Sequence, residues 1–293
     1  MRRGRSTRSS SPRSSSRHPR GASRPDWAER VTFYAEDENH GFGRGSNLVL
    51  KALAAREDPP KYVFLLNPDA ELTNETLKIL WDFMAEHPRV GIAGARIEKP
   101  GGVPVTAAFR FPSLASEFSA ALAFGPISRL FRKSDVPMGA HVPTGSVDWV
   151  AGAAFIARLD ALTEIDFFDP DYFLYYEEVC MMHRATLAGW EIWHVAEALV
   201  THVEGASTDV KSGRIERVRR PAYWYDSWQM YFVKNHSRGY ALLCAMGWMT
   251  GAALNFVLSR VRGKTPAAAL HFFGDFWAVG VRPLLGLKAH SYE

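Results

Sequence analysis

Asp69 stands at a position from which a carboxylate could act chemically. It follows directly after the apolar run Tyr62–Leu66, and open α/β sheets bind their ligands at the carboxyl ends of the strands. A carboxylate there can hold a hard divalent cation, which in turn neutralises a diphosphate. The sequence Asn-Pro-Asp is also a common turn, and for the motif taken alone the turn interpretation is favoured.

Three further side chains could carry chemistry. Glu177 and Glu178 follow an aromatic run at the expected start of a helix. Apolar neighbours raise the pKa of a carboxyl group and improve it as a general base, but acidic residues also favour helix N-termini through the dipole. Taken alone, the dipole interpretation is the better one. His202, after an expected strand, is by itself more typical of a structural histidine than of a ligand.

These residues lie in a segment where strands and helices alternate, which predicts an α/β fold with a mainly parallel sheet. The first helix is expected over residues 48–56 with Asn47 as its cap, and the second runs to about His87 from Thr73 or Asn74. A third helix is expected from Glu177 to about residue 188. The expected strands are residues 31–34, 62–66, 90–95, 147–157 and 190–200.

Composition limits the other functions that the chain could have. The 293 residues are 47% hydrophobic and include two cysteines, so a disulfide framework and structural zinc are not expected, and a reducing compartment is. Residues 1–25 carry eight of the 35 basic side chains and none of the 31 acidic ones, so the remaining residues carry 27 bases against 31 acids. A mildly acidic body does not indicate nucleic-acid binding.

The two ends of the chain differ from this central segment. Residues 1–25 are expected to be a disordered tail. Three interpretations of this tail remain open: a solvated segment without a specific role, a polyanion-binding or targeting arm, and an artefact of start-site or reading-frame assignment. Residues 100–147 predict a long excursion with one helix. Residues 211–293 predict a helical region, in which 239–259 form an uncharged stretch long enough for a bilayer. That stretch is a packing helix, an interfacial helix or a span.

The order of several motifs resembles that of the family 2 glycosyltransferases, and most closely their bacterial rhamnosyltransferase-like branch. The motifs cover about residues 31–210 and are, in order, ENHGFGRGSN, FLLNPDAEL, FRFPS, DWVAGAAFIAR, FFDPDYFLYYEE, R-x-x-x-x-GW and H-x-x-G-x-S. The resemblance implies the GT-A fold, in which a Rossmann-like mixed sheet flanked by helices binds a nucleotide-sugar. The domain would span residues 26–210. Sugar transfer would proceed with inversion, in a single in-line displacement.

The resemblance also implies roles for individual residues. Asn67 and Asp69 match the Asp-x-Asp-type motif, so Asp69 and His202 are expected to bind Mg²⁺ or Mn²⁺ at the donor's diphosphate. Glu178 stands where the family has the catalytic base that removes the proton of the acceptor hydroxyl. The other expected substrate contacts are Asn39 on the donor side, and Trp149, Gly152 and Glu177 on the acceptor side.

Four features depart from the family pattern. Glu178 replaces an Asp and is one methylene longer, Cys180 replaces the next acidic residue, and Asp166-Phe167 replaces a Gly-Gly pair. The opening hydrophobic strand and the Asp-Asn-x-Ser-x-Asp segment, which hold the nucleoside in the family, are absent, and the Arg/Ser-rich residues 1–25 stand in their place. A second hypothesis therefore stays open, namely a catalytically inactive or truncated relative that acts as a binding or scaffold protein.

The function that the resemblance implies is metal-dependent sugar transfer in cell-envelope polysaccharide assembly. The donor would be a dTDP- or UDP-sugar, with rhamnose a candidate sugar. The acceptor would be a saccharide or a polyprenyl-linked saccharide. The enzyme would be cytoplasmic and peripheral at the inner face of the cytoplasmic membrane, because the acceptors of this branch are held there. A third hypothesis, nucleic-acid binding through the Arg/Ser-rich tail, has the least support.

Overall fold

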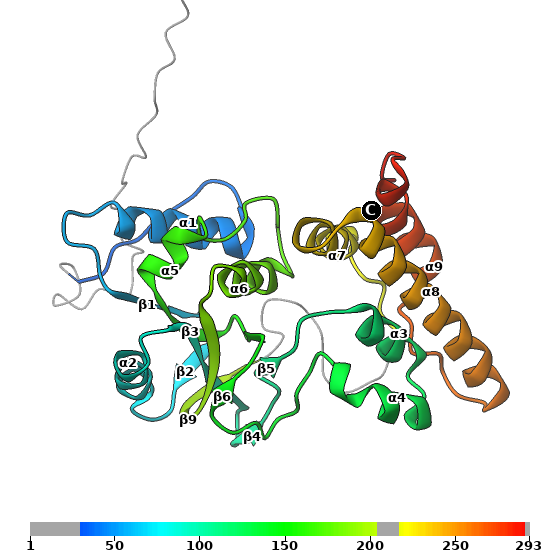
Figure 1. Cartoon of the computed structure of the whole chain (residues 1–293), viewed down its shortest axis with the longest axis horizontal. Coiled ribbons are helices and arrows are strands. Elements are labelled where there is room, and N and C mark those ends of the chain that lie inside the picture. The colour runs from blue at the N-terminus through cyan, green and yellow to red at the C-terminus, as the bar shows by residue number, and fades with distance from the viewer. Residues whose placement is uncertain (1–29, 204–216, 291–293) are drawn as a thin grey trace, which may run out of the picture. The chain divides into compact units, whose positions relative to one another are not determined.

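The computed structural model describes residues 30–203 and 217–290 and divides the chain into two compact units, 1–40 and 41–293 (Figure 1). In the first unit, residues 30–40 contain neither helix nor strand. The strand predicted at 31–34 is therefore wrong. β-propensity is a weak local signal, and a β-rich run becomes a strand only where the fold gives it a neighbouring strand. The predicted tail, residues 1–25, lies outside the described residues.

The second unit is built on a mixed sheet, which confirms the predicted α/β class. Its main path runs in the order β1-β8-β3-β9-β2, with β4 paired to β3 and β6 paired to β9. A separate small sheet pairs β5 with β7. The strands are β1 (Tyr62–Leu66), β2 (Ala70–Leu72), β3 (Val90–Lys99), β4 (Val103–Pro104), β5 (Ala108–Phe109), β6 (Gly145–Ser146), β7 (Trp149–Val150), β8 (Ala154–Arg158) and β9 (Glu191–His202).

The sheet is less parallel than the sequence predicts. β3 and β9 pair in parallel, whereas β8 lies antiparallel between β1 and β3. β1, β3 and β9 therefore run in the same direction, and β8 runs against them. As a result, the carboxyl ends of β1 and β9 and the amino end of β8 meet at one edge of the sheet. The predicted strand at 147–157 is two strands, β7 and β8, joined by a turn at Ala151–Ala153.

Helices cover both faces of this sheet (Figure 1). Alternate strand residues point to opposite faces. Val63, Ile92 and Phe155 pack with α1, α5 and α6, while their neighbours pack with α2. These helices are α1 (Gly41–Ala54), α2 (Thr76–Glu86), α5 (Leu159–Glu164) and α6 (Glu177–Leu187).

The first two helices begin at positions that the cap signals did not indicate. Asn47 lies inside α1, where its side chain donates to the Phe168 carbonyl at 2.8 Å and accepts from the Phe168 amide at 3.0 Å. α1 begins instead at Gly41, whose φ is +74°. A Cβ at Gly41 would lie 1.8 Å from the Phe173 carbonyl oxygen. Asn74 precedes α2 and bonds to the neighbouring β9 backbone.

The excursion at 100–147 contains two helices where one was predicted, α3 (Leu114–Leu122) and α4 (Gly125–Phe131), followed by the 3₁₀ turn η2 (Arg132–Ser134). Ser113 caps α3 by accepting from the amide of Ser116, whose hydroxyl in turn accepts from the Ser113 amide. Such reciprocal bonds satisfy the free donors of a helix start.

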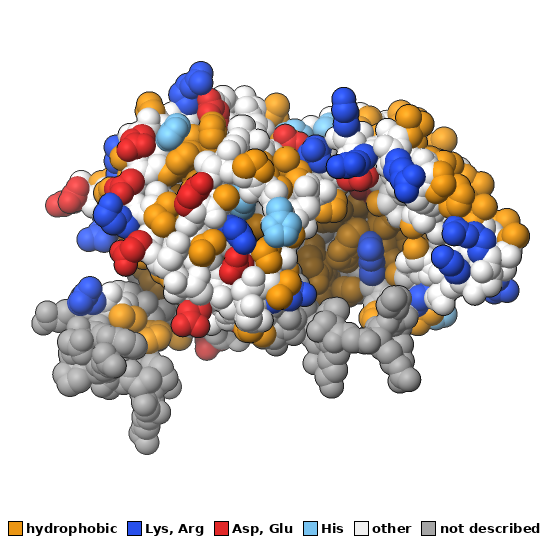
Figure 2. Space-filling model, turned by 90° about the horizontal axis from the view of Figure 1, so that it is seen from below, with side chains coloured by type: hydrophobic (Ala, Val, Ile, Leu, Met, Phe, Trp, Pro, Cys, Tyr) orange, Lys and Arg blue, Asp and Glu red, His pale blue; other side chains and the backbone are white. Residues whose placement is uncertain are grey.

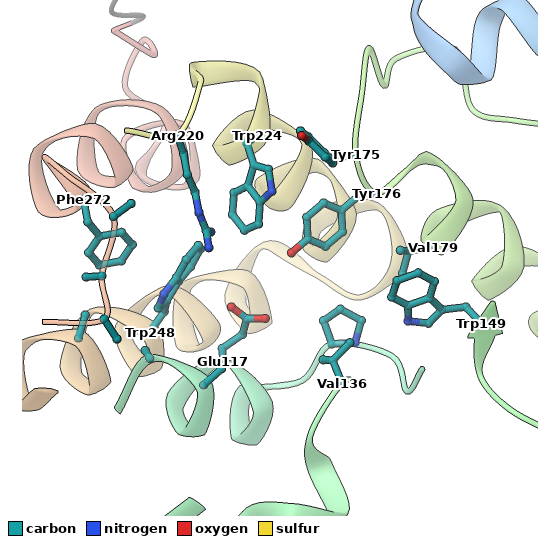
Figure 3. A pocket seen from close by; sticks show the side chains of 17 residues that line it. Glu117, Val136, Trp149, Tyr175, Tyr176, Val179, Arg220, Trp224, Trp248 and Phe272 are labelled. Carbon is teal, nitrogen blue, oxygen red and sulfur yellow. The ribbon is translucent and has the colours of Figure 1, made fainter. Parts of the chain in front are cut away.

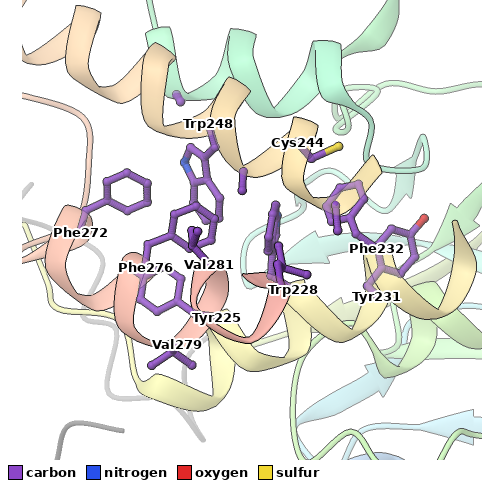
Figure 4. Close-up of a cluster of buried hydrophobic side chains, with 14 of the residues drawn as sticks. Tyr225, Trp228, Tyr231, Phe232, Cys244, Trp248, Phe272, Phe276, Val279 and Val281 are labelled. Carbon is purple, nitrogen blue, oxygen red and sulfur yellow. The ribbon is translucent and has the colours of Figure 1, made fainter. Parts of the chain in front are cut away.

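The C-terminal region forms a third, aromatic core (Figure 4). Trp228, Tyr225 and Phe276 are fully buried there, and Trp248 packs against all three. The elements are α7 (Ala222–Asn235), α8 (Arg238–Val261), α9 (Phe272–Asp275), the π-helical η3 (Phe276–Val281) and η4 (Pro283–Leu285). This confirms a helical C-terminal region. The predicted domain boundary near residue 210 falls in the segment 204–216, outside the described residues, and stays a prediction.

Helix α8 is held tightly against α3. A Cβ at Gly251 would lie 2.6 Å from the Phe118 carbonyl oxygen. The Asn255 side chain donates to the Leu122 carbonyl at 2.9 Å and accepts from the Ala267 amide at 2.8 Å. The two helices therefore pack through backbone contact, which leaves no space for a larger residue at Gly251.

We expect Gly251→Ala to lower the free energy of unfolding by about 1–3 kcal/mol, because backbone must move to admit the methyl group. The matched control is Gly45→Ala in α1, where a new Cβ meets nothing within 4 Å. This control should be neutral or stabilising by up to about 1 kcal/mol through helix propensity. Chemical denaturation of both variants measures the difference, and equal effects would contradict the tight α3–α8 contact.

Candidate active site

The turn after β1 positions Asp69. The Asn67 amide donates to the Ala153 carbonyl at 2.9 Å, which ties the turn to the start of β8. The Ala70 amide donates back to the Asn67 carbonyl at 3.1 Å, so the chain reverses within four residues and continues as β2. Asn-Pro-Asp is therefore a turn, and its tight geometry is what directs the Asp69 side chain toward the sheet edge.

The carboxyl end of β9 brings His202 to the same place. β2 pairs antiparallel with β9, with Ala70 opposite His202. His202 Nε2 lies 3.1 Å from Asp69 Oδ1, and the two side chains are only 16% and 18% exposed. His202 is the last residue of β9 rather than part of a following loop. Two residues 133 positions apart thus form one pair at the sheet edge.

A strained segment brings Glu177 and Glu178 to the site. Tyr175 and Tyr176 both have left-handed backbones, with φ of +69° and +68°. Such conformations are costly for residues other than glycine and persist only where the surroundings hold them. The segment reverses direction there and α6 begins at Glu177, so both carboxyl groups lie in its first turn.

The two carboxyl groups diverge from this helix start. Glu177 is 3% exposed and its Cβ lies near Gly43 of α1. The Glu178 side chain lies near Gly152, in the turn between β7 and β8. A Cβ at Gly152 would keep 3.8 Å from Glu178, an ordinary contact. An alanine would therefore fit at Gly152.

Burial raises the pKa of both carboxyl groups above the ordinary value of 4.5, and the charge of Glu178 raises the pKa of Glu177 further. The cause is the loss of solvating water, which disfavours the charged form. One oxygen of each group, Oε2, is buried and has no hydrogen-bond partner among the described residues. The first turn of α6 therefore carries two buried carboxyl groups of raised pKa, each with one oxygen that has no hydrogen-bond partner among the described residues.

The loop before this helix is held without the expected glycines. Asp166 and Phe167 have φ of +52° and +57°, which is the conformation that a Gly-Gly pair adopts without strain. Arg184 of α6 donates to the carbonyls of Ile165 and Phe167, both at 2.5 Å. Cys180, at the other changed motif position, is buried within hydrogen-bond distance of Asn235 of α7. Side chains of α6 and α7 thus contact both of these changed positions.

One cavity of about 580 Å³ joins these side chains. Trp149 forms part of its wall, stacked on Phe109 with ring centroids 4.0 Å apart and bonded through Nε1 to the Arg110 carbonyl at 2.9 Å. The site residues named from the sequence that line the cavity are Asn67, Asp69, Trp149, Gly152, Glu177, Glu178 and His202. Asn39 belongs to the N-terminal unit, residues 1–40, and its role stays a prediction.

The two candidate metal ligands at the sheet edge, Asp69 and His202, fit a divalent cation that a substrate helps to bind. Within the described part of the chain, no group of three His, Cys, Asp or Glu could hold a metal. Asp69 and His202 nevertheless present one carboxylate oxygen and one imidazole nitrogen to each other at the cavity wall. Mg²⁺ and Mn²⁺ sites in phosphate-transferring enzymes use few protein ligands and complete their shell with phosphates and water.

Sequence reasoning missed several lining residues, among them Phe42, Thr106, Phe109 and Tyr175. Phe42 and Tyr175 lie inside quoted motifs, ENHGFGRGSN and FFDPDYFLYYEE, so the resemblance contained a signal for them. Phe109 also lies inside a quoted motif, FRFPS, whereas Thr106 lies outside the motifs, in a stretch without clear periodicity. Phe109 of β5 pairs opposite Trp149 of β7, and this pairing brings it to the cavity.

No protein-family model matches the chain, but curated relatives exist. The N-acetylglucosaminyl-diphospho-decaprenol L-rhamnosyltransferase of Mycobacterium tuberculosis is 28% identical over 182 residues, which cover 58% of this chain and 58% of that enzyme. Rhamnosyltransferase WbbL of Escherichia coli K12 is 24% identical over 160 residues, covering 53% of this chain and 58% of the relative. The match thus spans under two thirds of each relative's length.

Solved structures show a weaker likeness. The structure of GalNAc-T7 with UDP, GalNAc and Mn²⁺ matches 90% of this chain and 48% of its own, with a TM-score of 0.47 and 11% identity. The mannosyltransferase PcManGT of Pyrobaculum calidifontis in complex with GDP-Man and Mn²⁺ matches 89% of this chain and 68% of its own, with a TM-score of 0.44 and 16% identity. TM-scores below 0.5 do not establish a relationship, so the likeness to known proteins rests on the sequence relatives and the motifs. On that basis the chain is similar, over somewhat more than half of its length, to two bacterial rhamnosyltransferases.

Proposed function

We propose that this protein is an inverting, metal-dependent glycosyltransferase that moves a sugar, with rhamnose the first candidate, to a cell-envelope acceptor. One observation carries the proposal. The Asp69–His202 pair and the Glu177–Glu178 pair come from the turn after β1, the end of β9 and the start of α6, and they line the same cavity. The first pair suits a cation and a diphosphate, and the second suits the removal of a proton. Transfer of a sugar from a nucleoside diphosphate-sugar needs both kinds of site.

The donor end of the cavity lies at the sheet edge. Asp69 and His202 would hold Mg²⁺ or Mn²⁺, with Asn67 beside them as a hydrogen-bonding residue. When bound, the cation supplies positive charge that stabilises the departing nucleoside diphosphate. The donor would be a dTDP- or UDP-sugar. The chain's own contribution is to hold the diphosphate in one orientation against a rigid sheet.

The acceptor end lies at the start of α6. Glu178 takes the proton of the attacking acceptor hydroxyl, the hydroxyl oxygen forms its bond to the anomeric carbon, and the bond from that carbon to the diphosphate oxygen breaks. The raised pKa of Glu178 favours this proton transfer. Trp149 offers a flat apolar face to the acceptor sugar, while Gly152 and Glu177 complete the wall.

The acceptor class is supported by the mycobacterial relative, which is named for its acceptor, N-acetylglucosaminyl-diphospho-decaprenol. We infer that this chain takes a saccharide linked through a diphosphate to a polyprenol. Such acceptors are held in a membrane, so the protein would work in the cytoplasm at the inner surface of the cytoplasmic membrane.

The test is calorimetric titration of UDP and of dTDP into the full chain, with and without Mn²⁺. We expect one nucleotide to bind, and to bind more tightly with Mn²⁺, because Asp69 and His202 would hold the cation and its charge would offset that of the diphosphate. Donor sugars of that nucleotide are then screened for transfer. Failure of both nucleotides to bind would contradict the proposal and favour the non-catalytic alternative.

Helix α8 supports peripheral attachment to the membrane. It is the one helix in the described residues that is long and apolar enough to cross a bilayer, with a mean hydropathy of 1.7. One side of α8 packs on α3 through Gly251 and Asn255, as described above. Its free side exposes an apolar stripe with basic residues at the end, and Figure 2 shows apolar and basic side chains together over the C-terminal helices. The stripe is Leu243, Met246, Leu254, Val257 and Val261. We propose that α8 lies in the membrane interface.

We expect Val257→Glu to weaken binding to anionic phospholipid vesicles by about 10-fold, since it removes apolar area and adds a charge of the membrane's own sign. Val257 is 60% exposed. The control is Leu187→Glu at the end of α6, where Leu187 is 72% exposed. Vesicle co-sedimentation measures both variants. The interfacial assignment is wrong if the wild-type chain stays in the supernatant, or if the control loses binding equally.

A further inference from the structure

A polar cavity of about 300 Å³ lies where α8 ends against the turn between α3 and α4. We call it the α8-end cavity and define it by Phe124, Asn255, Ser259, Arg262, Lys264 and Thr265. The Asn255 side chain joins its walls, because it bonds to Leu122 of α3 and to Ala267 of the segment after α8. None of the described residues that line it lines the active-site cavity. The α8-end cavity is therefore a separate candidate binding site.

Two basic residues give this cavity a positive charge. Arg262 and Lys264 line it, and there is no Asp or Glu among the described residues that line it. The chain segments that build its walls, residues 118–134 and 227–274, contain no acidic residue either. The guanidinium carbon of Arg262 lies 5.4 Å from the centre of the Phe124 ring, a contact that holds the arginine against the wall. An anion that enters the cavity therefore meets two cations and no carboxylate of the wall.

The turn after α8 satisfies carbonyl groups that would otherwise repel an anion. The last carbonyls of a helix carry the negative end of its dipole, equivalent to about half an elementary charge. Here the Leu258 carbonyl accepts from the Arg262 amide at 3.1 Å, and the Ser259 carbonyl accepts from the Lys264 amide at 2.8 Å. The two full positive charges on the side chains of Arg262 and Lys264 therefore outweigh the partial negative charge of the helix end.

The α8-end cavity also offers hydroxyl groups. Ser259 and Thr265 line it, and Ser259 is only 7% exposed. Hydroxyl groups donate hydrogen bonds to phosphate oxygens, and lysine and arginine add charge-assisted bonds. A volume of about 300 Å³ exceeds what one inorganic phosphate ion fills, so there is room for groups esterified to the phosphate. The chemistry of the cavity therefore suits a phosphate ester.

The exposed apolar stripe of α8 reaches this cavity. Leu258 lines the cavity, and it lies four residues after Leu254 and three before Val261, which both belong to the stripe. Residues three or four positions apart are neighbours on a helix surface, so the stripe and the cavity wall are continuous. Figure 2 shows apolar and basic side chains next to one another over the C-terminal helices. A soluble phosphate ester would leave the stripe uncovered, whereas the acyl chains of a phospholipid would cover it.

We propose that the α8-end cavity binds the headgroup phosphate of an anionic phospholipid, with Arg262 and Lys264 on the phosphate oxygens and the acyl chains along Leu258 and the stripe. This site rests on the proposed attachment of α8 to the membrane interface and deepens it, because it names the lipid group that is recognised. It does not depend on the chemistry of sugar transfer. A bound headgroup would fix the depth and the rotation of α8 in the interface, which an apolar stripe alone leaves free.

The probe is dihexanoyl-phosphatidylglycerol, a short-chain lipid that is titrated into the full chain by calorimetry below its critical micelle concentration. We expect Lys264→Gln to bind it about 10-fold more weakly, because one charge-assisted contact to phosphate is lost. Arg262→Gln should act in the same way. The matched control is Arg132→Gln, since Arg132 is an exposed base of η2 that does not line the cavity. This control removes the same charge and should bind the lipid like the wild type.

Three outcomes would overturn the assignment. The first is an equal loss of binding in Arg132→Gln, which would reduce the effect to general electrostatics. The second is equal affinity of the wild type for glycerol 3-phosphate, which lacks the acyl chains and would identify a soluble phosphate ester as the ligand. The third is equal affinity for dihexanoyl-phosphatidylcholine, which has the same chains without a net negative charge. The last two comparisons use the wild-type chain and do not depend on the folding of a variant.

Sedimentation with phosphatidylglycerol vesicles tests the proposed attachment separately. If the wild-type chain binds the short-chain lipid but not the vesicles, the interfacial assignment of α8 is wrong and the cavity assignment stands. If it binds the vesicles but not the short-chain lipid, the attachment stands and the cavity assignment is wrong.

Discussion

Glu178→Gln is expected to lower kcat by about 10²- to 10⁴-fold and to leave donor affinity unchanged. General-base catalysis contributes a factor of this size, and glutamine fills the same volume without accepting a proton. The measurement is transfer of labelled sugar under saturating donor, with nucleotide binding followed by calorimetry. A variant that keeps its turnover would show that the base has been misassigned.

The matched variant is Glu177→Gln, which removes the same group one residue earlier. Glu177 lies toward Gly43 of α1 and Glu178 toward Gly152, so the two should differ in effect. We expect Glu177→Gln to change the KM for acceptor more than kcat. The opposite pattern, with turnover lost only at Glu177, would move the base to that residue.

The pH dependence follows from the same carboxyl groups. Because burial raises the pKa of Glu178 above 4.5, the active, deprotonated form is lost as the pH falls through that raised value. The wild-type rate should therefore climb with pH over a range above that of an ordinary carboxyl group. The residual rate of Glu178→Gln should lack this rise. Glu178→Asp retains a base but withdraws it by one methylene, and a lower rate would show that the site has adapted to Glu.

Asp69→Ala is the second substitution with a large expected effect. We expect it to weaken nucleotide binding in Mn²⁺ by on the order of 10²-fold and to abolish the difference between titrations with and without the metal. Asp69 contacts His202 at 3.1 Å. The variant therefore removes one of the two expected metal ligands and leaves the other, His202, in place. Calorimetry with UDP and dTDP measures the loss.

Asp58→Ala is the control for this experiment, since Asp58 is an exposed carboxylate in the loop before β1. It removes the same charge without touching the cavity and should bind nucleotide like the wild type. If Asp69→Ala retained metal-dependent binding, the metal would have to be held elsewhere and Asp69 would be a turn residue alone. If both variants lost binding equally, general electrostatics would explain the effect.

Local sequence was sufficient to predict the elements that have a strong apolar pattern or that end at a glycine. The run Tyr62–Leu66 is β1, Gly189 ends α6 with a φ of +93°, and the strand after it is β9. These features depend on neighbouring residues, whose sterics act over one or two turns. The cap assigned to Asn47 is wrong because a contact 121 residues away holds its side chain, and no local rule contains that contact.

By itself the sequence determined the α/β class, the helical C-terminal region, the likeness to bacterial rhamnosyltransferases and the set of side chains worth testing. The order of the motifs and the chemistry of their residues can be read without knowing the fold. Only the tertiary structure decided how those side chains meet. The reversed strand β8 places Gly152 at the edge where β1 and β9 end, and left-handed Tyr175 and Tyr176 direct Glu178 toward it. The cavity lined by Glu117, Arg220 and Trp248 (Figure 3) is likewise invisible in the sequence, since these residues meet only after α3, α7 and α8 have packed. Strand direction and helix packing depend on the total burial of apolar surface, and that is a property of the whole fold.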